Sequence, residues 1–370
     1  MSARSLSIAL LALVAAVTAQ AGSDLNSQVF GYEDWVRSVK ELGLDPAEVV
    51  YPFHVDDEMQ SWVRDRMDRF HSASPEVQLK ALQQSFFDRG EFEFDYEQAR
   101  TLTAEEAFAV RHGNCMSFTS LFIALSRSAG LPTFLVAVER DPAIEKDENL
   151  VVVNRHVVAG YRAPDKMHLF DFYVTAVEPA IERNVIDDLG ASALYHTNIG
   201  GREIRRGNYH EAVRHLEIAT VIEPDWAPAW VNLGVSRMRI GDDVGAMEAY
   251  RQALIAEPGN SSALVNMAGV YRSRGLEEEA RTAMLAAAEG SRNPFTLIAM
   301  ADMEMLRGDH EEARQYLRRA RWWYSKEPEV YEAFSRLAIS TGDDEKGRKY
   351  ADKAAALRAR AERGDEADPD

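Results

Sequence analysis

The stretch from residue 111 to 133, RHGNCMSFTSLFIALSRSAGLPT, decides the fold of the N-terminal half of this chain. After a glycine turn, helical spacing places one stripe of residues on the same face: Cys115, Phe118, Phe122, Leu125 and Ala129. Gly130 and Pro132 follow, and residues of these two types commonly end helices. The sequence therefore predicts a buried helix over 115–129 with Cys115 in its first turn.

The segments on both sides of this helix indicate an α+β domain. Apolar residues three and four apart, following Pro, Asp, Ser or Thr, predict helices over 31–44, 56–70, 74–89 and 103–111. Branched and aromatic residues predict strands over 133–139, 149–161 and 166–174. We therefore expect helices first and an antiparallel sheet afterwards, with the domain ending near residue 190. The role of the early helices, as a lid or as a support for the sheet, stays open.

The single cysteine of the chain lies where a nucleophile would be prepared. Unpaired N–H groups and the positive end of the dipole at a helix N-terminus stabilise the thiolate form of Cys115. The same N–H groups can donate to an oxyanion when the thiolate attacks a carbonyl. His156 and Asp171 lie in consecutive predicted strands, where a carboxylate on one strand can orient an imidazole on its neighbour. The alternative is that Cys115 is a small buried apolar residue.

This order of residues resembles the transglutaminase-like (papain-like) cysteine fold, over about residues 95–180. The family's G-x-C, its apolar helix and its closing G-[IL]-P match Gly113–Cys115 and Gly130–Pro132. The resemblance implies three roles, nucleophile, general base and orienting acid, for Cys115, His156 and Asp171. Val158 stands where the family often has an aromatic residue, which concerns the substrate more than the triad. The remaining alternative is a decayed enzyme fold in which Cys115 only packs.

Other polar residues near the predicted site compete for these roles. We expect His112 on an exposed turn, and His168 on the opposite strand face from Asp171. Asn114 is a candidate oxyanion donor or a helix cap, and Asn154 is a candidate polar neighbour on the face of His156. The sequence has no paired cysteines, no H-x-x-x-H or H-E-x-x-H spacing and no glycine-rich phosphate loop. We therefore expect neither a metal nor a cofactor.

From about residue 193 the sequence repeats with a period of 34 residues. Six positions of the first copy recur one period later with the same or a similar residue: Gly200, Gly207, Ala212, Leu216, Ala219 and Pro224. Later copies are less regular, and about five fit between 193 and 357. This pattern resembles the tetratricopeptide repeat family. The resemblance implies an all-α solenoid of stacked helix pairs that binds a protein or peptide.

The repeats carry a second set of candidate residues, on the surface expected to meet a partner. Three amides recur in the first helix of successive copies, at Asn198, Asn232 and Asn266, and could hydrogen-bond the backbone of an extended peptide. Arg205 and Arg239 are also 34 residues apart and could add positive charge. The alternative is that asparagine is simply common at that position and that the arginines are solvated.

The ends and the overall charge limit the location and the partners. Residues 1–21 combine Arg4, a short apolar run and an A-x-A ending, which predicts a signal peptide. A retained membrane anchor is the competing interpretation, although the apolar run is short for a bilayer. The net charge of −18 argues against nucleic acid and anionic membranes as ligands. We expect residues 358–370 to form a disordered charged tail.

Together these observations predict an exported thiol hydrolase, a peptidase or amide hydrolase, in the bacterial periplasm or secreted from the cell. Its repeats would recruit a protein substrate or partner, and no membrane insertion is expected after signal cleavage. One alternative is a transamidase or acyltransferase of the same fold. The other is a catalytically silent scaffold that binds partners through its repeats.

Overall fold

The computed structural model describes residues 31–88, 92–97, 100–147, 150–164, 166–172, 183–289, 291 and 293–362, with side chains from 139 to 155 and at 183, 361 and 362 left out. The predicted signal peptide, residues 1–21, lies outside these residues, as does the end of the predicted tail. The chain divides into two units, Met1–Pro142 with Arg155–His196, and Ala143–Asn154 with Thr197–Asp370. Each unit has hydrophobic clusters of its own.

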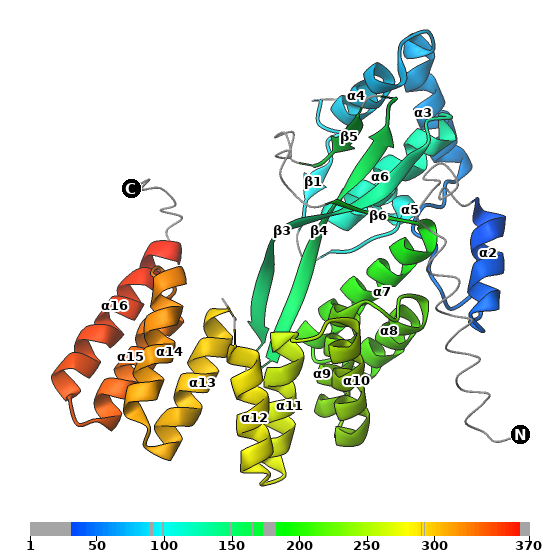
Figure 1. Ribbon diagram of the computed structural model, residues 1–370. Coiled ribbons are helices and arrows are strands. Elements are labelled where there is room, and N and C mark those ends of the chain that lie inside the picture. The colour runs from blue at the N-terminus through cyan, green and yellow to red at the C-terminus, as the bar shows by residue number, and fades with distance from the viewer. Residues whose placement is uncertain are drawn as a thin grey trace, which may run out of the picture. The chain divides into compact units, whose positions relative to one another are not determined.

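Helices form over each helical segment predicted for the first unit (Figure 1): α2 (Tyr32–Glu41), α3 (Asp57–Met67), α4 (Pro75–Ser85), α5 (Ala104–Val110) and α6 (Cys115–Ser128). A short 3-10 helix, η1 (Asp68–Phe70), follows α3. Their starts follow from local sequence, since the Asp56 side chain accepts a hydrogen bond from the N–H of Met59. Thr103 and Glu106 form the capping box that opens α5.

The predicted strands form a four-stranded sheet in the order β5-β4-β3-β6. Its strands are β3 (Thr133–Asp147), β4 (Leu150–Arg162), β5 (Met167–Phe170) and β6 (Arg183–Ile186). β5 pairs antiparallel with β4, as expected from the sequence, and β6 pairs antiparallel with β3. β6 had no clear sequence signal. A separate parallel pair, β1 (Asp95–Tyr96) with β2 (His112–Gly113), was also not expected, and it holds the turn that precedes α6.

Helix α6 lies at the centre of the first unit, with every residue from Met116 to Ser126 buried. Aromatic rings surround it. The ring of Phe118 lies 5.6 Å from the ring of Phe86, the residue just after α4. The ring of Phe122 lies 5.1 Å from the ring of Phe170, the last residue of β5. Each fully buried phenylalanine contributes on the order of 2 kcal/mol of transfer free energy, so this cluster fixes α6 against its neighbours.

The second unit consists mainly of helices that pair in succession, each with the next (Figure 1), which is the all-α solenoid predicted from the repeats. The helices of the array are α7 (Asp188–Arg205), α8 (Tyr209–Ile222), α9 (Ala227–Arg239), α10 (Asp243–Ala256), α11 (Ser261–Ser273), α12 (Glu277–Ala288), α13 (Pro294–Arg307), α14 (His310–Trp323), α15 (Pro328–Ser340) and α16 (Asp344–Glu362). The residues of α7 up to His196 belong to the first unit and the rest to the second. None of the helices among the described residues is long and apolar enough to cross a membrane.

Small residues at the repeat positions explain why the helices approach so closely. A Cβ atom on Gly234 of α9 would lie 2.3 Å from the ring of Tyr250 on α10, so only glycine fits there. Gly241, in the turn between these two helices, has the left-handed φ of 83° that favours glycine.

Two boundaries differ from those expected. The first helix of the array starts at Asp188 rather than near residue 193. The last helix reaches Glu362, which corrects the prediction that the tail begins at residue 358. Residues 344–362 contain six alanines, no proline and a single glycine, Gly347, so their helix propensity carries the helix past the end of the repeat pattern.

Candidate functional site

Cys115 is the first residue of α6 and its side chain is only partly buried. Asn114 precedes it in extended conformation as the N-cap, and the Asn114 Oδ1 atom accepts the N–H of Ser117 over 3.1 Å. Gly113 is required by close packing, because a Cβ atom there would lie 2.4 Å from that of Ser117. The glycine turn therefore delivers the thiol to the positive end of the helix, where solvent can reach it.

His156 and Asp171 are hydrogen-bonded, with 2.8 Å between His156 Nε2 and Asp171 Oδ2. The register pairs Ala159 with Phe170, so Asp171, one residue past β5, is the diagonal neighbour of His156 on the same sheet face. The side chain of His156 is 19% exposed and that of Asp171 is 3% exposed. A buried carboxylate therefore orients a half-buried imidazole, as the sequence predicted for these two residues.

The thiol of Cys115 is close enough to His156 to be one of the groups that raise the pKa of this histidine. Burial alone would lower the pKa of His156, but the interactions of its ring with the Asp171 carboxylate and with Cys115 outweigh burial and raise this pKa to about 9. Because Nε2 is bonded to Asp171, Nδ1 is the ring nitrogen left for the sulfur. At neutral pH the site thus favours an imidazolium beside the sulfur, which can stabilise a thiolate and later supply a proton.

Two further side chains hold the elements of this site together. Thr119, one turn after Cys115, donates its buried hydroxyl to the carbonyl of Val157 over 3.3 Å, which ties α6 to β4. Gln83 on α4 donates its amide to the carbonyl of Asp171 over 2.8 Å. Sequence reasoning missed both. A polar residue inside an apolar helix was a usable signal for Thr119, whereas nothing local marks Gln83.

The competing histidines lie elsewhere. His112 Nε2 is 2.7 Å from the guanidinium of Arg100 and 3.2 Å from the carboxylate of Glu97. These two contacts account for the position of His112 on the turn, with no need for a contact to the Cys115 sulfur. His168 pairs across the sheet with Tyr161, and their ring centroids are 6.4 Å apart.

The two candidate auxiliary residues have different outcomes. The side-chain amide of Asn114 donates to the hydroxyl of Thr101 over 2.8 Å, while its oxygen caps α6. Of the two alternatives left open for Asn114, oxyanion donor or helix cap, the structure places it as the helix cap, and its hydrogen bonds shape the turn. The side chain of Asn154 lies outside the described residues.

Comparison with known protein families agrees with this geometry. Residues 65–166 match the model of the transglutaminase-like superfamily. The chain carries a transglutaminase-like domain. The match includes Cys115 and His156 and stops five residues before Asp171, and it begins earlier than the resemblance noted from the motifs. It therefore takes in α4 and part of α3, helices that no motif had connected with the site.

Two curated proteins are similar to shorter pieces of the chain. One is a heat-shock protein cognate co-chaperone, sgt12, of Aspergillus fumigatus, 31% identical over 93 residues, which are 25% of this chain and 27% of that protein. The other is superkiller protein 3 of Schizosaccharomyces pombe, 36% identical over 64 residues, or 17% of this chain and 5% of that protein. The chain thus spans about a quarter or less of these relatives.

Two solved structures are similar to about half of this chain. PilF of Pseudomonas aeruginosa is 23% identical with a TM-score of 0.40, over 45% of this chain and 76% of PilF. TTC0263, a thermophilic TPR protein of Thermus thermophilus, is 19% identical with a TM-score of 0.38, over 45% of this chain and 96% of TTC0263. The 34-residue period and the paired helices of the chain itself establish the tetratricopeptide fold.

Within the tetratricopeptide array, the predicted asparagines are largely buried. Asn232 on α9 is 2% exposed and Asn266 on α11 is 4% exposed, whereas Asn198 on α7 is half-buried. Oδ1 of Asn232 and both polar atoms of Asn266 have no hydrogen-bond partner in the described part of the chain. Such unsatisfied groups are costly unless a ligand pairs with them.

The predicted arginines differ from each other in the structure. Arg205 is exposed, near the end of α7. Arg239 is half-buried, and its guanidinium lies 5.8 Å from the centroid of the Tyr209 ring. Arg239 therefore contributes to packing between helices, while its part in binding a partner stays a prediction.

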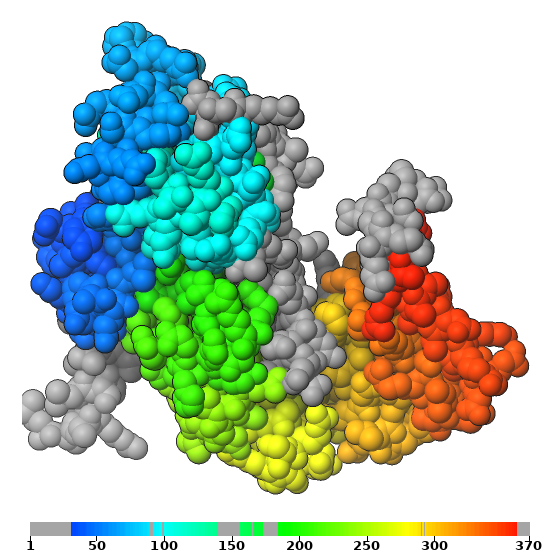
Figure 2. All heavy atoms as spheres, turned by 180° about the vertical axis from the view of Figure 1, so that it is seen from behind, coloured from blue at the N-terminus to red at the C-terminus, as the bar shows by residue number. Residues whose placement is uncertain are grey.

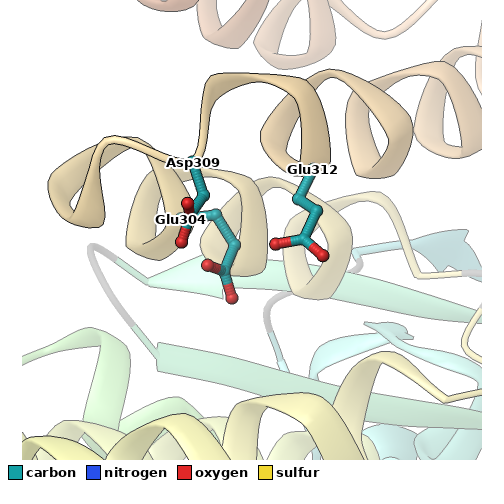
Figure 3. Close-up of side chains that lie close together, drawn as sticks. All are labelled: Glu304, Asp309 and Glu312. Atoms are coloured by element: carbon teal, nitrogen blue, oxygen red, sulfur yellow. The ribbon is translucent and has the colours of Figure 1, made fainter.

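Three carboxylates converge between α13 and α14, from Glu304, Asp309 and Glu312 (Figure 3). Glu304 is 1% exposed, and Arg281 approaches it to 3.3 Å. Arg307 lies 3.7 Å from both Glu304 and Asp309. These guanidinium groups already supply positive charge to the carboxylates, so the cluster is explained as an ion-pair network.

Proposed function

We propose that this protein is an exported thiol hydrolase that cleaves amide or ester bonds through Cys115, His156 and Asp171. The observation that carries the proposal is His156 itself, which is hydrogen-bonded to Asp171 and lies close enough to Cys115 for that thiol to raise its pKa. That arrangement supplies a nucleophile, a proton carrier and a group that orients it. The half-exposed sulfur meets the further requirement of access.

The reaction follows from the positions of these groups. The Cys115 sulfur attacks the carbonyl carbon, and the electron pair of the C=O bond moves to oxygen. When the oxyanion collapses, the C–N or C–O bond breaks and His156 gives its proton to the leaving group. Water, losing a proton to His156, then attacks the thioester and releases the acid together with the free thiol. If an amine takes the place of water, the same site performs transamidation.

The backbone at the start of α6 supports the charged intermediate. Ser117 N–H is bonded to the Asn114 side chain, and Phe118 N–H is bonded to the Asn114 carbonyl. The N–H groups of Cys115 and Met116 come before these in the first turn, so we assign them as donors to the oxyanion. Removing one such donor typically costs about 10²–10³ in rate.

The tetratricopeptide array would hold a protein substrate or partner. Its support is the pair Asn232 and Asn266, whose buried amide groups have unused hydrogen-bonding capacity that an extended peptide backbone would satisfy. The export step rests on the leader pattern of residues 1–21, so the protein would act outside the cytoplasm.

A matched set of variants tests the catalytic proposal. Purified full-length protein is mixed with a peptide nitrophenyl ester, and release of nitrophenol is followed together with labelling of the protein by iodoacetamide. Cys115→Ala and His156→Ala should lose roughly 100-fold or more of the esterase rate. His112→Ala changes a neighbouring histidine outside the triad and should leave the rate nearly unchanged. An esterase rate that survives in Cys115→Ala would leave a scaffold as the better interpretation.

A further inference from the structure

A groove lies between the last two helix pairs of the array, lined by residues of α14 and α15 and of the start of α16. Its volume is about 410 Å³. Apolar groups form the floor, where the rings of Phe334 and Tyr350 stack with centroids 5.1 Å apart beside Leu337 and Ala338. Figure 2 shows the atoms of these helices in orange and red at the C-terminal end of the array. A floor of this size accommodates one or two apolar side chains of a ligand.

The walls of this groove carry mostly positive charge. Four cationic side chains line it: Arg314, Arg318, Arg321 and Lys346. Asp343 is the acid in the lining, 3.9 Å from Lys346. Glu311, outside the lining, contacts both Arg314 and Arg318. Four cations against these two carboxylates leave a surplus of positive charge in a groove with an apolar floor.

The surplus is unusual for this chain. Residues 310–362 contain 12 Lys and Arg and 10 Asp and Glu, whereas the whole chain contains 42 and 60. Most of the molecule therefore repels an acidic ligand, and this region attracts it. This difference in charge gives the groove a preference for acidic ligands that the rest of the surface lacks.

Helix geometry aligns the cations with an exposed aromatic side chain. Arg314 and Arg318 are one turn apart on α14, and Arg321 lies on the same face. Trp322 follows Arg318 by one further turn and is 80% exposed. Arginine and tryptophan are the residue types that dominate the binding energy of protein interfaces. Arg321 also lies 5.3 Å from the centroid of the Phe334 ring, which places a guanidinium at the edge of the apolar floor.

We propose that this groove binds an acidic peptide segment of a partner protein, with an apolar side chain on Phe334 and Tyr350 and carboxylates beside Arg314, Arg318 and Arg321. The site is separate from the predicted asparagines, which lie on α7, α9 and α11. It does not depend on the thiol chemistry proposed for Cys115. The array would thus offer a second surface, selective for charge, in addition to the asparagine surface.

The test uses full-length protein and a fluorescein-labelled octapeptide in which Asp and Glu flank a central Leu-Phe pair. Fluorescence anisotropy should show saturable binding that weakens as salt is raised, because the attraction is electrostatic. The same peptide with Asn and Gln in place of the acids should bind at least roughly tenfold more weakly. Equal binding of the two peptides would overturn the proposal.

Charge reversal locates the site. Arg318→Glu with Arg321→Glu should weaken binding at least roughly tenfold. The matched control is Arg214→Glu with Arg251→Glu, which changes the net charge by the same amount at exposed positions on α8 and α10. Because Arg321 contacts Phe334, Arg318→Glu alone is measured as well, at a rim position that is 59% exposed. Equal effects of groove and control variants would overturn the proposal, as would binding of phosphatidylglycerol vesicles without binding of the peptide.

Discussion

The side-chain amide of Gln83 donates a hydrogen bond of 2.8 Å to the backbone carbonyl of Asp171. Gln83 belongs to α4, whereas Asp171 follows β5, 88 residues later in the chain. The carboxylate of Asp171 in turn holds His156. An early helix of unassigned role therefore supports the acid of the proposed triad, which favours the supporting role over that of a lid for this part of the N-terminal helices.

Replacing Gln83 by Ala should loosen Asp171 without removing any group that reacts. We expect the pKa of His156 to fall below about 9, because the hydrogen bond that its ring donates to Asp171, which raises this pKa, becomes less well aligned. The esterase rate should fall by roughly an order of magnitude. Titration of the His156 ring by NMR measures the first effect. The matched control is Gln84→Ala, the same change at the next, exposed position of α4. If both variants titrate alike, Gln83 has no positioning role.

The pH dependence of the reaction should report the raised pKa of His156. A histidine with its pKa raised from 6.5 to about 9 keeps its proton across the neutral range and loses it as the pH rises through 9. Leaving-group protonation therefore weakens above pH 9. Asp171→Asn removes the negative charge of the main group that raises the pKa of His156, while burial still lowers this pKa. The upper limb of the pH–rate profile should therefore move to lower pH. A profile whose upper limb stays in place would contradict this assignment.

Local sequence predicted one part of this site and could not predict the other. The glycine turn and the apolar stripe place Cys115 at the start of α6, and strand periodicity places His156 and Asp171 on one face. Both follow from neighbours within a few residues. The contact of Gln83 with Asp171 depends on how α4 packs against the loop after β5, and the pairing of β1 with β2 joins two segments that are each two residues long. No pattern of such short segments identifies their partner.

Two adjacent hydroxyls on α6 should respond differently to removal. Thr119 is bonded to the carbonyl of Val157, whereas the hydroxyl of Ser120 is buried with no hydrogen-bond partner in the described structure. Thr119→Val should therefore lower the free energy of unfolding by about 1–2 kcal/mol. Thr119→Ser keeps the hydroxyl and should keep most of this stability. Ser120→Ala should be neutral or slightly stabilising, since it removes an unsatisfied polar group. Urea denaturation followed by circular dichroism measures all three. Equal losses for Thr119→Val and Ser120→Ala would show that the bond to Val157 is unimportant.

Two glycines of the array allow the effect of close packing on stability to be measured apart from the effect of backbone entropy. A Cβ atom at Gly234 would lie 2.3 Å from the ring of Tyr250, which is fully buried, so Gly234→Ala should cost about 1–3 kcal/mol through forced repacking. Gly269 lies inside α11 with nothing within 4 Å of its Cβ position. Gly269→Ala should instead stabilise the array by about 0.4–1 kcal/mol, because alanine loses less conformational entropy on entering a helix. Thermal unfolding of the full chain gives both values. Opposite signs are expected, and a Gly234→Ala variant as stable as the natural chain would mean that Tyr250 can move aside and that this glycine does not set the spacing of α9 and α10.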